Sequence, residues 1–400
     1  MCLRRSTSAL AASLTTCALL VTACAGSSST ADSTPSTSPA SATSPPASDT
    51  PAAVSPEPAP PTPTPLADTR VLAPQGPTTV AGNLRTPWGL TFLPDRSALV
   101  SERDSGRIVR VDPGGATTAL GVVPGVDAGG EGGLLGIAVR PRAAGSTGPF
   151  ELYAYLTAAQ DNRVVRMTLD LGAGGAALGE PAPILTGIPK ANIHNGGRIT
   201  FGPDGMLYVA TGDASVNGRS QDPQSLSGKI LRLTPEGQPA EGNPTAGSPV
   251  WSLGHRNVQG LAFDSRGQLW ASEFGQNRLD ELNRIQAGGN YGWPEVEGPG
   301  GRVGFIDPVA SWATSEASPS GIAIAGNAIW MAALRGQRLW QIPIPGGAVG
   351  EPVAHFTREY GRLRHVELAP DGSLWVLTNN TDGRGNARAG DDRVLGIRLT

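Results

Sequence analysis

A strand–turn–strand pattern recurs six times along the sequence, and this repeat restricts the fold more than any other feature. Each copy begins with an apolar-x-apolar strand, passes through a turn and returns as a second apolar strand. The first strands are Leu90-Thr91-Phe92, Ile137-Ala138-Val139, Ile199-Thr200-Phe201, Leu261-Ala262-Phe263, Ile322-Ala323-Ile324 and Val366-Glu367-Leu368. They start 44 to 62 residues apart, which is enough for roughly four strands with their loops.

The turns and strand lengths of this repeat indicate antiparallel sheets. Turns such as Pro203-Asp204-Gly205 and Pro370-Asp371-Gly372 separate short strands that show no helical period. A third strand follows in runs such as 107–111 and 229–233. Six four-stranded units that close in a ring leave only short, protected edges. We therefore predict an all-β fold, a six-bladed β-propeller of four-stranded antiparallel blades, with an open sandwich or a solenoid as the alternative.

The first 24 residues have the pattern of a targeting segment. Two arginines precede an apolar stretch, residues 9–23, that is too short to span a bilayer. The stretch leads into Val21-Thr22-Ala23-Cys24, which resembles the lipobox of bacterial lipoproteins. We expect residues 1–24 to form a lipoprotein signal peptide with Cys24 as the lipidated residue. An ordinary cleaved signal peptide is the alternative.

Residues 25–67 separate this segment from the repeat. They are almost entirely Ser, Thr, Pro and Ala, a composition that cannot bury enough surface to fold. We expect a disordered tether over 25–67 and the propeller over 68–400, in an exported protein held at the membrane only by the lipid on Cys24. Because the three cysteines all lie within residues 1–24, no disulfide is expected in the mature protein.

The charge balance argues against one large class of partners. The 31 Lys and Arg side chains nearly offset the 34 Asp and Glu side chains, which leaves a formal net charge of −3. A nucleic-acid-binding domain usually carries a basic excess. We therefore expect no nucleic-acid partner.

Four segments do not fit the blade pattern. They are 129–136, 194–198 together with Gly212-Asp213, 254–260 and 272–294. Each places polar side chains or glycines where a predicted strand enters or leaves the ring. Because such strand ends converge on the central channel of a propeller, we expect the four segments to form one site.

Together and in this order, the four segments resemble the soluble quinoprotein glucose/aldose sugar dehydrogenases, propeller enzymes that use pyrroloquinoline quinone (PQQ). The resemblance extends over residues 80–400. It implies oxidation of an aldose sugar from hemiacetal to lactone by hydride transfer to the quinone. The sequence has no Cys-x-x-Cys-His haem motif, so the electrons are expected to pass to an external acceptor.

The resemblance implies roles for individual residues. His194 corresponds to the catalytic base and Asp213 to an acid that orients it. Arg256 and Asn257 correspond to the pair beside the reactive carbonyl. A neutral imidazole is suited to removing a hydroxyl proton near pH 7. The alternative for His194 is a turn residue that bonds only its neighbours.

Cofactor contacts are implied in the same way. PQQ carries three carboxylates, and the planar fork of Arg pairs a carboxylate through two hydrogen bonds. Arg362 and Arg364 correspond to the Arg-x-Arg that holds these carboxylates, although residues that alternate along a strand could also face solvent. Glu131 falls where the family has a Gln near the quinone.

Two departures from the family pattern concern the sugar. Glucose-specific members have a Lys just before an Arg-Gly, whereas this chain has Leu334 there, so Arg335 or Arg338 would have to substitute. They also have an Asp before the catalytic His, where this chain has Ile193. Both departures indicate the branch that oxidises a broader range of aldoses.

The family also implies two Ca²⁺ ions. The carbonyls of Gly275 and Gln276 would hold an ion at the quinone, and Glu281 with the carbonyl of Tyr291 would hold a structural ion. Ca²⁺ prefers oxygen ligands, including backbone carbonyls, and would polarise the quinone oxygens. The alternative for Glu281 is an ordinary charged turn beside Asp280.

Two other functions are compatible with the repeat. A metal-dependent lactonase on a six-bladed propeller would need several carboxylates or Asn side chains around one central cation. A surface-tethered, non-catalytic binding propeller would have lost its cofactor. The retained His194, Arg256, Asn257, Arg362 and Arg364 argue against such a loss, whereas the missing Lys keeps this alternative open. The remaining histidines, His355 and His365, are expected at the surface or in turns.

Overall fold

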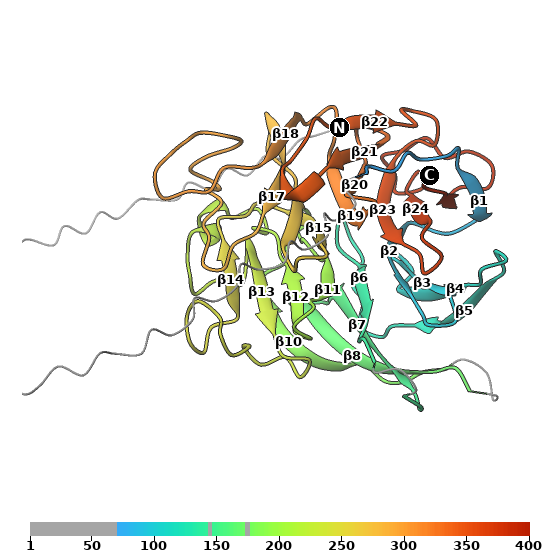
Figure 1. The fold of residues 1–400 in the computed structure, drawn as a ribbon. Helices are drawn as coiled ribbons and strands as arrows, with labels where there is room; N and C mark the ends of the chain where they lie inside the picture. The colour runs from blue at the N-terminus through green and yellow to red at the C-terminus, as the bar shows by residue number, and fades with distance from the viewer. Residues whose placement is uncertain (1–69, 143–145, 173–176) are drawn as a thin grey trace, which may run out of the picture. The chain divides into compact units, whose positions relative to one another are not determined.

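The computed structural model describes residues 70–142, 146–172 and 177–400. The predicted signal peptide (1–24) with Cys24 and the predicted tether (25–67) lie outside these residues. The described chain forms six sheets, each with four strands in antiparallel sequence and one of them with a short additional strand. The predicted six-bladed β-propeller of four-stranded antiparallel blades is confirmed (Figure 1).

The blades follow the order of the sequence repeats. Blade one contains β2 (Pro87–Phe92), β3 (Ala98–Glu102), β4 (Arg107–Val111) and β5 (Thr117–Val122). Blade two contains β6 (Leu134–Val139), β7 (Phe150–Thr157), β8 (Asn162–Asp170) and β10 (Ala182–Ile188), with β9 (Ala177–Leu178) paired to β8. Blade three contains β11 (Ile199–Phe201), β12 (Leu207–Ala210), β13 (Lys229–Leu233) and β14 (Val250–Leu253).

The second half of the ring repeats this plan. Blade four contains β15 (Val258–Phe263), β16 (Leu269–Glu273), β17 (Leu279–Arg284) and β18 (Ala310–Ala313). Blade five contains β19 (Pro319–Ala325), β20 (Ala328–Ala333), β21 (Arg338–Pro343) and β22 (Val353–His355). Blade six contains β23 (Leu363–Leu368), β24 (Leu374–Thr378), β25 (Val394–Ile397) and, from the start of the chain, β1 (Thr78–Ala81).

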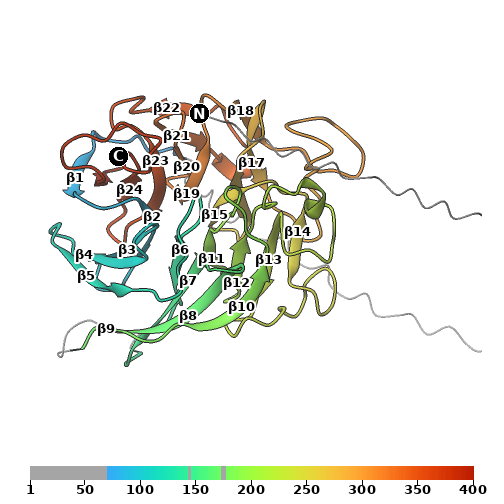
Figure 2. The ribbon, with the colours of Figure 1, turned by 180° about the vertical axis from the view of Figure 1, so that it is seen from behind.

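The ring is closed by the pairing of β1 with β25. Thr78 is opposite Gly396, and Thr79 is opposite Leu395, in an antiparallel ladder with one irregularity. Both views show β1 beside the strands of the C-terminal blade (Figures 1 and 2). This closure joins segments more than 300 residues apart, so the last blade cannot form without the first strand of the domain.

The first strands of the blades line the centre. Each of β2, β6, β11, β15, β19 and β23 packs against the first strand of the next blade, and β23 packs against β2 to complete the circle (Figure 1). The N-terminal ends of these strands face the same mouth of the central channel. The polar segments singled out in the sequence precede or begin these strands, which explains why they can meet.

Serine hydroxyls connect neighbouring blades close to the centre. Ser101 donates to the carbonyl of Leu135 at 2.6 Å, and Ser272 donates to the carbonyl of Ser320 at 2.5 Å. In blade four a Cβ at Gly260 would lie 2.3 Å from the Ser272 hydroxyl. A glycine at this position therefore leaves the space in which the hydroxyl reaches the next blade.

Apolar side chains fill the space between blades. Trp270 of blade four packs with Ile322 and Met331 of blade five, and all three are buried. Fully burying side chains of this size stabilises the fold by roughly 1.5–3 kcal/mol each. The rigid, closed ring therefore provides a fixed frame for the loops at the channel mouth.

The Pro-Asp-Gly turns end the strands by a local mechanism. Asp204 accepts the backbone N–H of Met206 at 3.0 Å, and Gly205 has φ +75°, a conformation that favours glycine. Helical structure in the described residues is confined to two 3-10 turns, Asn217–Ser220 and Pro345–Gly347. In that part of the chain, no helix has the length and apolarity needed to cross a membrane.

Candidate active site

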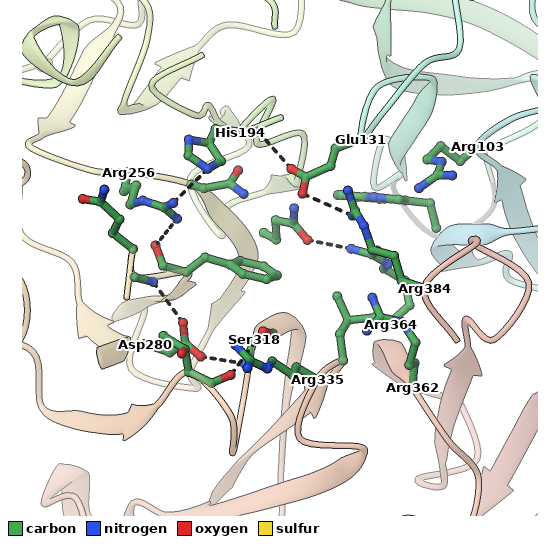
Figure 3. A pocket seen from close by; sticks show the side chains of 18 residues that line it. Arg103, Glu131, His194, Arg256, Asp280, Ser318, Arg335, Arg362, Arg364 and Arg384 are labelled. Atoms are coloured by element: carbon green, nitrogen blue, oxygen red, sulfur yellow. Dashed lines mark hydrogen bonds and ion pairs between the residues drawn. The ribbon is translucent and has the colours of Figure 1, made fainter. Parts of the chain in front are cut away.

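A cavity of about 290 Å³ opens at the mouth of the channel where the N-terminal ends of the inner strands meet (Figure 3). Its charged lining residues come from all six blades and the loops that connect them. They are Arg103, Glu131, His194, Arg256, Asp280, Arg335, Arg362, Arg364 and Arg384. Six guanidinium groups face two carboxyl groups, so the cavity is built for an anion.

His194 lies at the wall of this cavity between an acid and a base. Its Nδ1 is 2.8 Å from Oδ1 of Asp213, and its Nε2 is 2.9 Å from Nη2 of Arg256. A guanidinium can only donate hydrogen bonds, so Nε2 must be the acceptor. The ring proton is therefore on Nδ1 and is donated to Asp213, while the unprotonated Nε2 accepts the hydrogen bond from Arg256.

The backbone of His194 is held in an uncommon conformation. Its φ is +61°, and its N–H donates to Oε2 of Glu131 at 2.9 Å. The other oxygen of Glu131 is 3.3 Å from Nη1 of Arg384. Glu131 therefore joins the loop of the histidine to a loop of blade six across the mouth of the cavity, an interaction that a Gln could make only in part.

Asp213 is fully buried behind the histidine. Besides His194, it accepts the backbone N–H of Ser215 at 2.7 Å and the indole N–H of Trp293 at 2.9 Å. These donors fix both carboxylate oxygens. The imidazole therefore meets an acceptor that cannot rotate away, as expected for a residue that orients a base.

Arg256 is buried and has hydrogen-bond partners on two sides. Nη1 donates to the carbonyl of Phe274 at 3.2 Å, and the backbone N–H donates to the carboxylate of Glu273. Within the described residues, the buried Nε has no partner. Burial lowers the pKa of Arg256 from its ordinary value, although Asp213 and Glu273 oppose this change. An anion in the cavity would compensate this charge.

His255 supports Arg256 from outside the cavity. Its Nδ1 is 2.8 Å from Glu273, its Nε2 is 2.8 Å from the hydroxyl of Ser252, and its ring stacks on Tyr291. The buried Asn257, on the other side of Arg256, accepts the N–H of Gly196 at 3.0 Å. The segment 255–257 is thus anchored by Glu273 and Ser252 and ties Arg256 to the loop of His194.

Arg362 and Arg364 differ in their partners. Arg362 pairs with the fully buried carboxylate of Asp382 at 3.0 Å. Arg364 is buried and donates only to neutral groups: Nη1 is 2.6 Å from Gln259, and Nη2 is 3.1 Å from Asn379. Burial lowers the pKa of Arg364 to about 9. In the view of Figure 3 both arginines lie on the side of the cavity opposite His194.

Comparison with known proteins agrees with this geometry. A family model described as glucose/sorbosone dehydrogenase matches residues 84–387. The chain belongs to this family. The solved structure of the PQQ-bound form of an aldose sugar dehydrogenase from Streptomyces coelicolor is 56% identical, with a TM-score of 0.78, and the match covers 82% of this chain and 98% of that one.

Curated relatives also belong to this group of sugar oxidoreductases. Aldose sugar dehydrogenase YliI of Escherichia coli is 30% identical, and the match covers 74% of this chain and 88% of that protein. Quinoprotein glucose dehydrogenase B of Acinetobacter calcoaceticus is 33% identical over 55% of this chain, and the match spans about half of that protein, 52%. The resemblance to quinoprotein sugar dehydrogenases stated from the sequence is therefore confirmed.

The glucose/sorbosone dehydrogenase cavity gathers most of the residues expected from the sequence. Glu131, His194, Arg256, Asn257, Arg335, Arg362 and Arg364 line it, together with Gly275 and Gln276. Asp213 lies directly behind His194. Arg335 lines the cavity, whereas Arg338 donates to the carbonyl of Gly336 and lies over the ring of Trp340 instead. Of the two candidates for the missing Lys, the position of Arg335 is the suitable one.

Several lining residues were given no role in the sequence analysis, among them Trp88, Arg103, Gln259, Thr314, Ser318 and Arg384. Arg384 is in a Gly-Arg-Gly stretch, and Arg103 follows strand β3, so neither belongs to a recognisable motif. Gln259 lies within segment 254–260 but was given no role. The indole of Trp88 lies beneath the guanidinium of Arg364, 5.7 Å from ring centre to Cζ. These residues lie far apart in the sequence and meet only because the blades close into a ring.

The donor set fits a flat tricarboxylate such as PQQ. The cavity offers six guanidinium groups, and the charge of Arg364 has no carboxylate bonded to it. An anionic ligand would stabilise two of these groups. One is the buried guanidinium of Arg364, which bonds only to neutral groups, and the other is that of Arg256, whose Nε has no partner among the described residues. The residues present therefore match the cofactor that the family uses.

The ligands predicted for the two calcium ions lie in different places, and only the first pair lines the cavity. Gly275 and Gln276 line the cavity. Glu281 lies elsewhere and accepts the N–H of Gly298 at 2.7 Å, and burial with the nearby Glu273 carboxylate raises its pKa. The side chain of Tyr291 donates its hydroxyl to the carbonyl of Arg284. Among the described residues, no three His, Cys, Asp or Glu side chains converge on one point, so a cation at either place would depend on backbone carbonyl oxygens.

Proposed function

We propose that this chain is a PQQ-dependent aldose dehydrogenase that oxidises the hemiacetal of an aldose sugar to the lactone and passes the electrons to an external acceptor. One observation supports this most strongly: a histidine at the wall of an arginine-lined cavity has its Nδ1 proton held by a buried carboxylate and an unprotonated Nε2 that accepts a hydrogen bond from Arg256. The family membership and the PQQ-bound relative from Streptomyces coelicolor support the same conclusion.

Different residues of the cavity have different roles in the proposed reaction. When bound, PQQ supplies an ortho-quinone that accepts the hydride from the sugar carbon. His194 takes the proton of the anomeric hydroxyl at Nε2, while Asp213 keeps the ring in the right tautomer and orientation. Arg256 holds a donor beside Nε2 and places positive charge near the reacting oxygen. The glycines Gly196 and Gly197 let the loop of His194 pack closely, because a Cβ would lie 2.5 Å from the backbone of Thr211 and 2.6 Å from Leu135, respectively.

Arginines on the opposite wall hold the cofactor. Arg364 presents a guanidinium bonded only to neutral partners, and Arg362, Arg103 and Arg384 add further cationic groups from three loops. Such an array can bind several carboxylates at once, because each fork can donate two parallel hydrogen bonds. Leu334 stands where glucose-specific relatives have Lys, and the neighbouring Arg335 contributes positive charge to the same wall of the cavity, in keeping with a broader choice of aldoses.

Calcium would be held by oxygen atoms of the chain. The carbonyls of Gly275 and Gln276 at the cavity suit a hard divalent cation that polarises an oxygen of the bound quinone. For a second, structural ion, Glu281 supplies a buried carboxyl group next to Glu273, with the carbonyl of Tyr291 as its proposed co-ligand. The raised pKa of Glu281 is a burial cost that a bound cation would offset.

The two other candidate functions fit the site less well. A metal-dependent lactonase needs acidic side chains around one central cation, and the described residues contain no such group. A binding propeller without catalysis would have no use for a base held in a single tautomer. The reconstitution assay distinguishes the lactonase and the binding propeller from the dehydrogenase.

The cellular location is also part of the proposal. The lipobox-like sequence before Cys24 and the Pro-rich stretch after it support an exported lipoprotein, tethered to the membrane through residues 25–67. The variant Cys24→Ala should be absent from the membrane fraction and should lack incorporated labelled palmitate. Undiminished membrane retention of this variant would rule out lipidation at Cys24 as the anchor.

Reconstitution tests the function directly. The metal-free protein is incubated with PQQ and CaCl₂, and reduction of an artificial dye is followed with a panel of aldoses. We expect sugar-dependent reduction that requires both additions and that several aldoses support. Hydrolysis of sugar lactones without PQQ would indicate the lactonase, and PQQ-free sugar binding without turnover would indicate the binding propeller.

A further inference from the structure

One carboxylate oxygen beside the cavity accepts four consecutive backbone amides. Oε1 of Glu297 receives the N–H groups of Gln276 at 2.7 Å, Asn277 at 3.1 Å, Arg278 at 3.0 Å and Leu279 at 3.3 Å. Burial acts to raise the pKa of Glu297, but these backbone hydrogen bonds outweigh it and lower the pKa below its ordinary value. Glu297 itself is not among the residues that line the cavity.

The direction of the amides determines the direction of the carbonyls. The N–H of Gln276 shares a peptide plane with the carbonyl of Gly275, and the N–H of Asn277 shares one with the carbonyl of Gln276. Both peptide bonds are trans, so each carbonyl points opposite to its N–H. With the N–H groups on Glu297, the two carbonyls are turned away from that carboxylate.

These two carbonyl oxygens are also unused. No donor in the described part of the chain forms a hydrogen bond with the carbonyl of Gly275 or of Gln276. By contrast, the carbonyl of Phe274 accepts Nη1 of Arg256. Both Gly275 and Gln276 line the cavity. The loop therefore presents a pair of free oxygens where the family resemblance implies a cation.

The loop has little freedom to turn these oxygens elsewhere. On its other side, the N–H of Gly275 donates to Oδ1 of Asp280 at 2.9 Å (Figure 3). A Cβ at Gly275 would lie 1.8 Å from the carbonyl oxygen of Leu279 and 2.8 Å from Oε1 of Glu297. Close packing of this kind explains the glycine and fixes the loop between the two carboxylates.

We propose that Glu297 is a positioning residue that holds the carbonyl oxygens of Gly275 and Gln276 toward the cavity as a preformed half-site for a divalent cation. The inference rests on the proposed function, which supplies the reason for a cation in the cavity. Carbonyl oxygens arranged before binding save the ordering cost that a loose loop would incur. Glu297 thereby acts on cation affinity without touching the cation.

The test compares Glu297→Gln with Glu295→Gln. Glu295 lies two residues earlier, is half-exposed and forms only a 3.6 Å ion pair with Arg302, so its variant controls for loss of charge on the same loop. Metal-free full-length protein with excess PQQ is titrated with CaCl₂ in the absence of sugar, and cofactor uptake is read from its absorbance. We expect Glu297→Gln to raise the CaCl₂ concentration for half-maximal uptake roughly tenfold or more, with the control unchanged.

The other outcomes are decisive as well. An unchanged CaCl₂ midpoint in Glu297→Gln overturns the proposal, even if the melting temperature falls, because the residue would then be merely structural. Wild-type protein that takes up no PQQ at any CaCl₂ concentration overturns the proposed function itself. If Glu297→Gln does not fold, Glu297→Asp is used, which keeps the charge but withdraws the oxygen by one methylene. We expect Glu297→Asp to raise the CaCl₂ midpoint by a smaller factor. A midpoint equal to that of the wild type would overturn the proposal.

Discussion

Nη2 of Arg256 donates to Nε2 of His194 over 2.9 Å, and this contact determines which ring nitrogen is the acceptor. With Asp213 taking the proton of Nδ1, the imidazole is held in one tautomer from both sides. The two residues come from adjacent blades, 62 positions apart in the sequence. The basic nitrogen is thus set by the assembled ring and not by the local sequence around the histidine.

Replacing the histidine should remove proton abstraction selectively. His194→Gln keeps a similar volume and a hydrogen-bonding end but cannot act as a base near pH 7, so sugar-dependent reduction of PQQ should slow by on the order of 10²–10⁴-fold. Single-turnover stopped flow measures this rate. PQQ uptake should stay near normal because the arginines remain. His355→Gln, on β22 away from the cavity, is the matched control, and a wild-type rate in His194→Gln would refute the assignment of the base.

The two arginines of the Arg-x-Arg should respond differently to truncation. Arg364→Ala removes a guanidinium that bonds only to neutral groups, so PQQ affinity should fall roughly tenfold or more with a modest change in stability. Arg362→Ala strands the fully buried carboxylate of Asp382, so it should lower the free energy of unfolding by roughly 3–5 kcal/mol. PQQ titration measures the loss of cofactor affinity in each variant, and urea denaturation measures the loss of stability. Equal effects of both variants on both quantities would contradict the pairing seen in the structure.

Asp280 should make the stability of the cofactor-free protein depend on pH. Burial raises its pKa from 3.8 to about 6, despite the N–H groups of Ser318 and Gly275 that favour the ionised form. Between those values the folded state keeps a proton that the unfolded state has lost, so stability falls as the pH rises from about 4 to 6 and then levels off. The loss amounts to about 3 kcal/mol at most.

Urea denaturation of the wild type and Asp280→Asn from pH 4 to pH 7 measures this loss. The variant lacks the titrating group, so the difference between the two free energies of unfolding should change across the window. Parallel curves for Asp280→Asn would show that its carboxyl titrates normally.

Local sequence patterns predicted the blades well, because each blade forms from neighbouring strands. The runs 107–111 and 229–233 coincide with β4 and β13. The pairing of β1 with β25 was not predicted, since Thr78–Ala81 carries no signal of its own and its partner comes from the end of the domain. His365, expected at the surface or in a turn, is buried instead. Inner strands of a propeller are covered on both faces, so alternation along them does not indicate exposure.

The candidate site was predictable where motifs carried it and not where packing did. His194 and Asp213 were found because glycines and polar residues interrupt a strand pattern there. Arg103 and Arg384 were missed because single arginines in loops look like ordinary surface residues. Their role depends on the distance between loops of different blades, such as the 3.3 Å contact of Arg384 with Glu131. The number of residues between two such loops in the sequence does not determine that distance.

Gly212 should be as necessary for the catalytic geometry as the residues that bear the chemistry. It lies one position before Asp213, and a Cβ there would come within 2.0 Å of the carbonyl oxygen of His194 and 3.0 Å of the backbone nitrogen of Gly196. Gly212→Ala must therefore push the loop of the histidine away from Asp213. Overpacking of this kind costs roughly 1–3 kcal/mol of stability, and a displacement of about 1 Å at a reacting group costs about 10²-fold in rate.

The matched variant for this prediction is Gly218→Ala. Gly218 is in the 3-10 turn Asn217–Ser220, and a Cβ there would meet no heavy atom within 4 Å, so stability and rate should match the wild type. Thermal unfolding and kcat/KM with an aldose are measured for both variants. Because backbone atoms meet the new methyl group, no rotamer change can relieve the clash in Gly212→Ala. A Gly212→Ala enzyme with full activity would mean that the loop of His194 can shift without moving its Nε2, and that the contact with Arg256 does not define the reactive geometry.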